Sequence, residues 1–118
     1  MNKYNKFLGQ IGENVACEYL KRRGYRILQR NFSCKNGEID IISYKDKKII
    51  FIEVKTRTNL NYGRPIEAID KDKKTHIYNT AKYFLYKNNC LDKEIRFDAI
   101  EIIIKNKQVF INQIKQIL

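Results

Sequence analysis

The sequence is poor in the residues that build disulfide frameworks and zinc sites. It has three cysteines, Cys17, Cys34 and Cys90, and one histidine, His76. The cysteine count is odd and no C-x-x-C pair occurs, so neither a disulfide framework nor a zinc knuckle is predicted. A single histidine also excludes a histidine-based metal cluster. Free thiols fit a reducing cytosol, and we expect a cytoplasmic protein.

Long apolar runs are also missing. The first ten residues, MNKYNKFLGQ, hold no apolar core of signal-peptide length, and no run approaches the ~20 apolar residues of a membrane span. We therefore expect no membrane association. One proline and five glycines argue against a linker-rich or disordered chain. The length of 118 residues suits one domain, which we expect to cover residues 1–118.

Positive charge is what the chain has in excess. It carries 24 lysines and arginines against 13 acidic residues, a formal net charge of +11. A field of this size favours polyanions, and nucleic acid is the default partner. The alternative is that a composition rich in lysine, asparagine and isoleucine reflects drift in a low-GC genome, with the charge spread over a solvated surface.

Hydrophobic periodicity predicts two helices. The first covers residues 5–23 and ends at Gly24; its apolar stripe consists of Leu8, Ile11, Val15 and Tyr19. The second begins at Asp70 or Asp72 and ends near Lys87; its buried stripe consists of Ile77, Ala81 and Phe84. Five strands are predicted at residues 25–32, 38–44, 49–56, 95–104 and 108–112. A polar loop is predicted at 58–64 and a short helical turn at 65–69. Residues 113–118 fit either a helix or an extended chain.

Charged residues interrupt the third predicted strand. Strand side chains alternate between faces, so Glu53 and Lys55 project side by side from the apolar run FIEV. Charges in such a run are rare unless they are paired or functional. The pattern therefore favours a functional carboxylate and a functional amine at these two positions.

The turn between the second and third strands predicts which residues face each other. If it centres on residues 46 and 47, paired residue numbers sum to 93 and Asp40 faces Glu53. Directly opposed residues have Cβ atoms about 5 Å apart, so two opposed carboxylates destabilise a hairpin unless a cation lies between them. Mg²⁺ or Mn²⁺, which prefer oxygen ligands, would supply that charge. A one-residue slip would turn Ile39 and Ile41 to the wrong face.

A purely structural alternative uses the same register. Glu38 then lies opposite Lys55 and forms a cross-strand ion pair, while Asp40 and Glu53 form an exposed rim. Glu13 is also open to two interpretations. It lies at the edge of the helical stripe, beside small residues that would let the helix approach the sheet closely. By spacing alone, however, it is a half-exposed surface residue.

The motifs resemble those of a known nuclease superfamily. The strings G-E-I-D at residues 37–40 and F-I-E-V-K-T-R at 51–57 resemble the PD-(D/E)XK superfamily. With G-x-x-G-E at 9–13, R-G-Y at 23–25, R-N at 30–31, G-x-P at 63–65 and R-F-D at 96–98, the chain is identified as a member of the YraN-like family, whose members are described as similar to Holliday-junction resolvases. The resemblance implies an α/β, restriction-endonuclease-like fold with a central mixed five-stranded sheet flanked by helices.

The resemblance also implies a role for each matching position. Asp40 and Glu53 would be ligands of Mg²⁺ or Mn²⁺, and Glu13 an additional carboxylate at the site. Lys55 would orient the attacking water or stabilise charge on the phosphate. The implied reaction is metal-dependent hydrolysis of phosphodiesters in structured or branched DNA. A homodimer is plausible by resemblance alone.

Four further residues are candidates for contact with nucleic acid. Arg57, Lys73 and Lys74 would contact phosphates beside the site or are solvated surface. Tyr62 would stack on a base or anchor its loop. Two other functions stay open: a non-catalytic nucleic-acid-binding module of the same fold, and a structural or partner-binding protein without nucleic-acid contact. Elsewhere, Asp98 beside Arg96 predicts a structural salt bridge.

Overall fold

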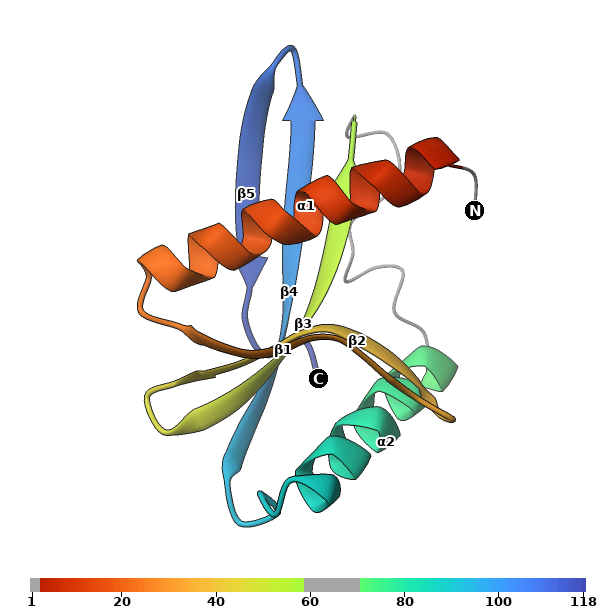
Figure 1. The fold of residues 1–118 in the computed structure, drawn as a ribbon, viewed down its shortest axis with the longest axis vertical. Coiled ribbons are helices and arrows are strands. Elements are labelled where there is room, and N and C mark those ends of the chain that lie inside the picture. Colours follow the sequence, from red (N-terminus) through yellow and green to blue (C-terminus); the bar gives the residue numbers. More distant parts are fainter. Residues whose placement is uncertain (1–2, 59–70) are drawn as a thin grey trace.

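The computed structural model describes residues 3–58 and 71–118 (Figure 1). The elements in these residues are α1 (Lys3–Arg22), β1 (Arg26–Cys34), β2 (Gly37–Lys45), β3 (Lys48–Arg57), α2 (Lys71–Lys87), β4 (Glu94–Lys105) and β5 (Gln108–Ile114). Every predicted helix and strand is confirmed, with bounds that differ by no more than two residues. The predicted loop beyond Thr58, the helical turn at 65–69 and Tyr62 lie outside the described residues.

The five strands form one mixed sheet in chain order, β1-β2-β3-β4-β5. Neighbouring strands are antiparallel except for β3 and β4, which are parallel. Parallel neighbours need a crossover connection, and α2 lies in the connection between these two strands. The architecture is the restriction-endonuclease-like arrangement that the resemblance implied, a mixed five-stranded sheet flanked by helices.

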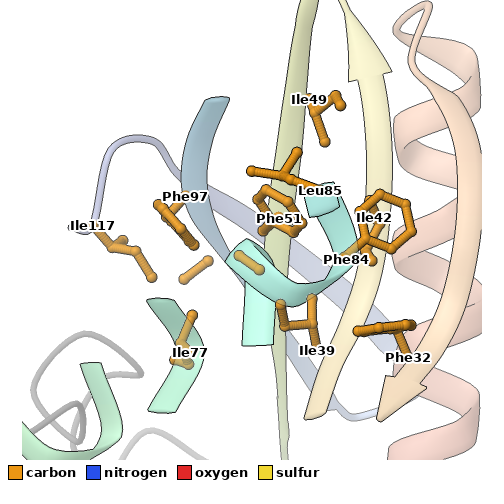
Figure 2. Close-up of a cluster of buried hydrophobic side chains, with 12 residues drawn as sticks. Phe32, Ile39, Ile42, Ile49, Phe51, Ile77, Phe84, Leu85, Phe97 and Ile117 are labelled. Carbon is orange, nitrogen blue, oxygen red and sulfur yellow. The ribbon is translucent and has the colours of Figure 1, made fainter. Parts of the chain in front are cut away.

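Each helix packs on its own hydrophobic core, and the two cores use alternate residues of the strands. Figure 2 shows the core under α2, where Phe51 lies between Phe84 of the helix and Phe97 of β4. The ring centroids of Phe51 and Phe84 are 6.0 Å apart, and those of Phe51 and Phe97 are 5.3 Å apart. The core under α1 contains Ile50 and Ile52, which point to the other face of β3. Burial of each such side chain contributes about 1.5–3 kcal/mol.

The buried face of α1 differs from the predicted stripe. Its fully buried positions are Gly12, Ala16, Cys17 and Leu20. Val15 and Tyr19 of the predicted stripe are only partly buried and pack at the edge of the core. The helix is therefore rotated toward its small residues, because these let it approach the sheet more closely than the larger apolar residues would.

α1 approaches the sheet closely at Gly12. A Cβ atom built on Gly12 would overlap Oγ1 of Thr56 and lie 2.8 Å from its Cβ. Only glycine leaves room for the Thr56 side chain at this crossing. The crossing in turn sets the depth at which the next residue, Glu13, meets β3.

The end of α1 is confirmed at Gly24. Gly24 has φ 87°, a conformation that glycine adopts at little cost. The N–H of Tyr25 donates to the carbonyl of Leu20 at 3.0 Å, and the N–H of Gly24 donates to that of Lys21 at 3.1 Å. This pair of hydrogen bonds is the Schellman motif that often closes a helix.

The predicted salt bridge in β4 is confirmed and fixes the end of the chain. Arg96 donates two hydrogen bonds to the fully buried carboxylate of Asp98, at 2.9 and 2.8 Å. Gln113 and the backbone N–H of Gln116 donate to the same carboxylate at 3.0 and 3.1 Å. Residues 115–118 are therefore held against β4 without regular secondary structure, and Gln116 has φ 58°.

Candidate functional site

The candidate site lies where β2 and β3 separate. The predicted register, in which residue numbers sum to 93, is confirmed from the turn to the pair Ile41 and Ile52. The ladder ends there, so the predicted direct pairs of Asp40 with Glu53 and of Glu38 with Lys55 are wrong. The backbone N–H of Val54 instead donates to Oδ2 of Asp40 at 2.7 Å.

A change of face in β2 explains why the ladder ends. Ile39 packs in the core under α2, whereas Ile41 packs in the core under α1. Regular alternation would put residues 39 and 41 on one face, as the sequence predicted, so the strand turns over at Asp40. This turn carries the Asp40 carboxylate out of the ladder, where it reaches the Val54 N–H.

The neighbouring strand β1 changes face at the same level. Phe32 pairs with Ile39 and lies in the core under α2, whereas Arg30 pairs with Ile41 and reaches α1. The residue between them, Asn31, has φ 53°. Asparagine tolerates this left-handed conformation better than most residues do. The turn of both strands opens a space between α1 and the sheet.

That space is a cavity of about 620 Å³ with an acidic lining and basic residues at its edge. Three of the four predicted catalytic residues, Glu13, Asp40 and Glu53, line it together with Glu38. The remaining described lining residues are Lys6, Gly9, Gln10, Asn14, Arg30, Asn31 and Val54. Lys55 is absent from the described lining. It lies half-buried on β3, opposite Glu101 of β4.

Burial and the neighbouring carboxylates oppose the ionisation of Asp40. Burial, and next the charge of Glu53, raise the pKa of Asp40 to about 7. The hydrogen bond from Val54 acts in the opposite direction, and Glu13 and Glu38 raise the pKa further. Asp40 therefore holds its proton more tightly than a free aspartic acid does, and the cavity favours added positive charge.

Glu13 lies partly buried in the site, so it is less exposed than a free surface residue. Its side chain is 12% exposed, and its Oε1 accepts a hydrogen bond of 3.1 Å from Nε of Arg30. The same guanidinium donates to Oδ1 of Asn14 at 2.7 Å. Arg30 thus ties β1 to two consecutive residues of α1. Sequence reasoning assigned no role to Arg30, and its only signal was the R-N motif at residues 30–31.

Glu53 meets a lysine from the other helix. Nζ of Lys73, in the first turn of α2, lies 3.3 Å from Oε1 of Glu53, whose side chain is 17% exposed. This contact confirms that Lys73 lies beside the site. Lys74 is exposed at the next position of the helix. Arg57 points to a different carboxylate, with Nε 3.9 Å from Oε2 of Glu101.

The cavity offers the oxygen ligands that a hard divalent cation prefers, but these ligands are not grouped around one point. Such ions take carboxylate oxygens, and Glu13, Asp40 and Glu53 offer these in one cavity. Within residues 3–58 and 71–118, however, no three histidine, cysteine or acidic side chains are grouped closely enough to hold a metal ion. Glu13 and Glu53 are instead drawn to Arg30 and Lys73, from opposite sides of the cavity.

Comparison with known proteins identifies the family. A model of the "Uncharacterised protein family UPF0102" matches residues 12–102. The chain belongs to UPF0102. This is the YraN-like group that the motifs indicated, and the matched region contains Glu13, Asp40, Glu53 and Lys55.

Curated UPF0102 proteins are similar along most of the chain. One from Caldanaerobacter subterraneus subsp. tengcongensis is 40% identical over 100% of this chain and 98% of its own. One from Clostridium perfringens is 47% identical over 86% and 84%. One from Clostridium botulinum is 49% identical over 88% and 85%.

One solved structure shows a remote similarity. The crystal structure of SSO0001 matches with a TM-score of 0.39 and 18% identity. The match covers 98% of this chain and 54% of that longer protein. A similarity of this size establishes neither a shared site nor a shared function. Separately, none of the helices described for this chain is both long and apolar enough to cross a membrane.

Proposed function

We propose that this protein is a metal-dependent endonuclease that hydrolyses phosphodiesters of structured or branched DNA. The observation that carries the proposal is the convergence of Glu13, Asp40 and Glu53 on one cavity in a chain of net charge +11. Acidic side chains gathered in a strongly basic protein suit a metal site that works on a polyanion. Free thiols at all three cysteines support action in a reducing cytoplasm.

The proposed roles follow from where the side chains lie. Asp40 and Glu53 would hold Mg²⁺ or Mn²⁺ with help from Glu13, and when bound the ion would polarise the phosphoryl group and acidify a water. The Val54 N–H orients Asp40 toward the cavity. Lys55 would stabilise charge on the phosphate from the next position on the same side of β3.

The basic residues would position the nucleic acid. Lys73 and Lys74 stand in the first turn of α2, next to Glu53, and Arg57 lies near the end of β3. Contacts of such residues with phosphates would set affinity and register and would carry no sequence information. This fits a substrate that is recognised by its shape.

A second function is favoured by two observations. Lys55 is not among the described residues that line the cavity, and Glu13 and Glu53 already have cationic neighbours. A non-catalytic nucleic-acid-binding module would need neither a metal nor Lys55. It would use the same basic residues and keep the carboxylates as a structural ion-pair network.

Cleavage assays separate the two functions. The protein is incubated with Mg²⁺ or Mn²⁺ and labelled junction, flap and single-stranded substrates in DNA and RNA form. The endonuclease proposal expects metal-dependent cleavage of branched DNA that Asp40→Asn and Glu53→Gln each abolish. Glu18→Gln is the matched control, because Glu18 is an exposed α1 carboxylate whose only described ion pair is with Lys21.

Each alternative outcome has a definite meaning. Cleavage that survives Asp40→Asn and Glu53→Gln comes from a contaminant and contradicts the endonuclease. Binding without cleavage, unchanged or strengthened by Asp40→Asn, supports the binding module. A preference for RNA would contradict the proposed substrate, and absence of binding at low salt would contradict both functions.

A further inference from the structure

We propose that Arg30 and Lys73 pair with Glu13 and Glu53 as long as no divalent metal ion is bound. Metal binding then displaces both basic side chains and turns Arg30 to a substrate phosphate. This inference rests on the proposed metal site and adds an order of events to it. Cations of the protein hold the carboxylates first, the metal ion replaces them, and the displaced guanidinium then binds nucleic acid.

The contacts of Arg30 show how it holds Glu13. Its Nε donates to Glu13 at 3.1 Å and its Nη2 donates to Asn14 at 2.7 Å, so the guanidinium is fixed by two neighbouring residues of α1. The Glu13 side chain is 12% exposed, whereas that of Arg30 is 38% exposed. Arg30 is therefore the more exposed partner, and its side chain has solvent beside it to enter once the ion pair breaks.

Lys73 approaches from the opposite side of the sheet. Its Nζ lies 3.3 Å from Glu53, and its side chain is 35% exposed against 17% for Glu53. The pair repeats the arrangement at Glu13, with a partly buried carboxylate and a more exposed cation. The two cations come from different elements, β1 and α2, so the pattern does not depend on one local turn.

Charge repulsion favours the exchange. No three described acidic side chains are grouped around one point, and Glu13 and Glu53 are each paired with a basic side chain. An ion bound between the carboxylates would bring two positive charges within a few ångströms of both basic side chains. Like charges at that separation repel strongly in a partly buried site, so metal and cations compete for the same oxygens.

The displaced Arg30 would remain beside the cavity. It lines the cavity with Lys6 and Asn31, on the side where β1 turns over. A guanidinium offers a planar fork of donors that matches two phosphate oxygens, which a lysine cannot do. Metal binding would thus convert an internal ion pair into a phosphate-binding group next to the reacting bond.

The first test measures metal affinity without nucleic acid. Mn²⁺ is titrated by calorimetry into wild type, Arg30→Gln, Lys73→Gln and a control, Lys21→Gln. Lys21 carries the same charge on α1 and has a distant, exposed pair with Glu18. We expect Arg30→Gln and Lys73→Gln to bind Mn²⁺ about tenfold more tightly than wild type, because each loses a competing charge. Lys21→Gln should match wild type.

The second test measures nucleic-acid binding. Binding of a fluorescent four-way DNA junction is compared in Ca²⁺ and in EDTA. We expect Ca²⁺ to strengthen binding by wild type, and Arg30→Gln to bind the junction roughly tenfold more weakly than wild type in Ca²⁺. Tighter binding of Mn²⁺ together with weaker binding of the junction by Arg30→Gln would support the exchange. A structural role for Arg30 would weaken both, and Arg30→Lys should restore the wild-type metal affinity but not the junction affinity.

The outcomes distinguish this inference from the proposed function. If wild type binds Mn²⁺ and the two variants bind it no more tightly, the exchange is overturned while the metal site stands. If Arg30→Gln binds Mn²⁺ more tightly but binds the junction as wild type does, the phosphate role of Arg30 is overturned. If wild type binds no Mn²⁺, the metal site and the exchange fall together. Lys73→Gln keeps the first test decisive if Arg30→Gln does not fold.

Discussion

The side chain of Asp40 accepts the backbone hydrogen bond of Val54 at 2.7 Å, at the point where their two strands part. A carboxylate of β2 thereby completes the hydrogen bonding of β3 beyond the last ladder pair. Partial burial of the same carboxylate, and next the charge of Glu53, raise its pKa, with smaller effects from Glu13 and Glu38. Asp40 therefore has a structural contact and an electrostatic conflict at once, and the predictions below separate the two.

The conflict at Asp40 predicts a pH dependence of stability. Its pKa is about 7 in the fold and 3.8 without the fold, so the folded protein holds the proton more tightly. This stabilisation is complete below pH ~4 and is lost as the pH rises through about 7. At ~1.4 kcal/mol per pKa unit, the loss is at most about 4 kcal/mol. Urea unfolding in EDTA at several pH values measures it.

Asp40→Asn isolates this contribution. The asparagine still accepts from Val54 but cannot ionise, so the variant should lose the part of the pH dependence that lies between about 4 and 7. It should also be more stable than wild type above pH 7. A variant that is less stable than wild type at that pH would show that the charged carboxylate is favourable, contrary to the raised pKa.

A bound divalent ion should offset the repulsion between Asp40 and the nearby carboxylates. At pH 7.5, Mn²⁺ at ~100 times its dissociation constant should stabilise the fold by about 2.7 kcal/mol, or roughly 10 °C in Tm. The rise should be smaller at pH 5.5, because protons compete with the ion at Asp40. Thermal shift measures both values. An equal rise in Glu53→Gln would mean that the ion binds elsewhere.

The crossing of α1 and β3 predicts opposite effects of one substitution at two glycines. Gly12→Ala should destabilise the protein by about 1–3 kcal/mol and weaken Mn²⁺ binding, because the added methyl group meets Thr56 and lifts Glu13. Gly9→Ala is the matched control: a Cβ there has no neighbour within 4 Å, so helix propensity should stabilise by about 0.5–1 kcal/mol. Urea unfolding of both variants tests the crossing, and equal effects would contradict it.

Removing the buried carboxylate of β4 should be costly. Asp98→Ala would leave Arg96, Gln113 and the Gln116 N–H without their shared acceptor, at a cost of about 3–5 kcal/mol. Glu18→Ala, which removes an exposed ion pair, should cost less than about 1 kcal/mol. Chemical unfolding compares the two. A loss of similar size in both variants would mean that Asp98 does not organise the C-terminal residues.

Binding to DNA should depend steeply on salt. If Lys73, Lys74 and Arg57 each neutralise one phosphate, replacing any one with glutamine should lower the slope of log K against log salt by about 0.9. Lys93→Gln, at an exposed position before β4, is the control of equal charge. Fluorescence anisotropy over a salt series gives the slopes. An unchanged slope would remove that residue from the interface.

The fold was predictable because its signals are local. Alternation and helical spacing located every described helix and strand, and the turn at residues 46–47 set the register of β2 and β3 up to Ile41 and Ile52. Propensity and period act over a few residues, so a single sequence contains them. The gathering of Glu13, Asp40 and Glu53 followed from motif resemblance as much as from spacing.

The geometry of the site was less predictable because it depends on irregularities. At Asn31 and Asp40 the side chains of β1 and β2 stop alternating regularly between the two faces of the sheet. The predicted pairing of Asp40 with Glu53 had assumed regular alternation. An asparagine inside a strand pattern gives no reliable sign of a positive φ. The partners Arg30 and Lys73 meet their carboxylates only after α1 and α2 have packed on opposite faces of the sheet.

The contact of Gly12 with Thr56 also constrains the order in which these positions can change during divergence. A side chain at position 12 is costly while threonine stands at 56, because the two would overlap. A change from glycine to alanine at 12 is therefore better tolerated after threonine has given way to a smaller residue. Among relatives, larger residues at the first position are expected only alongside smaller ones at the second.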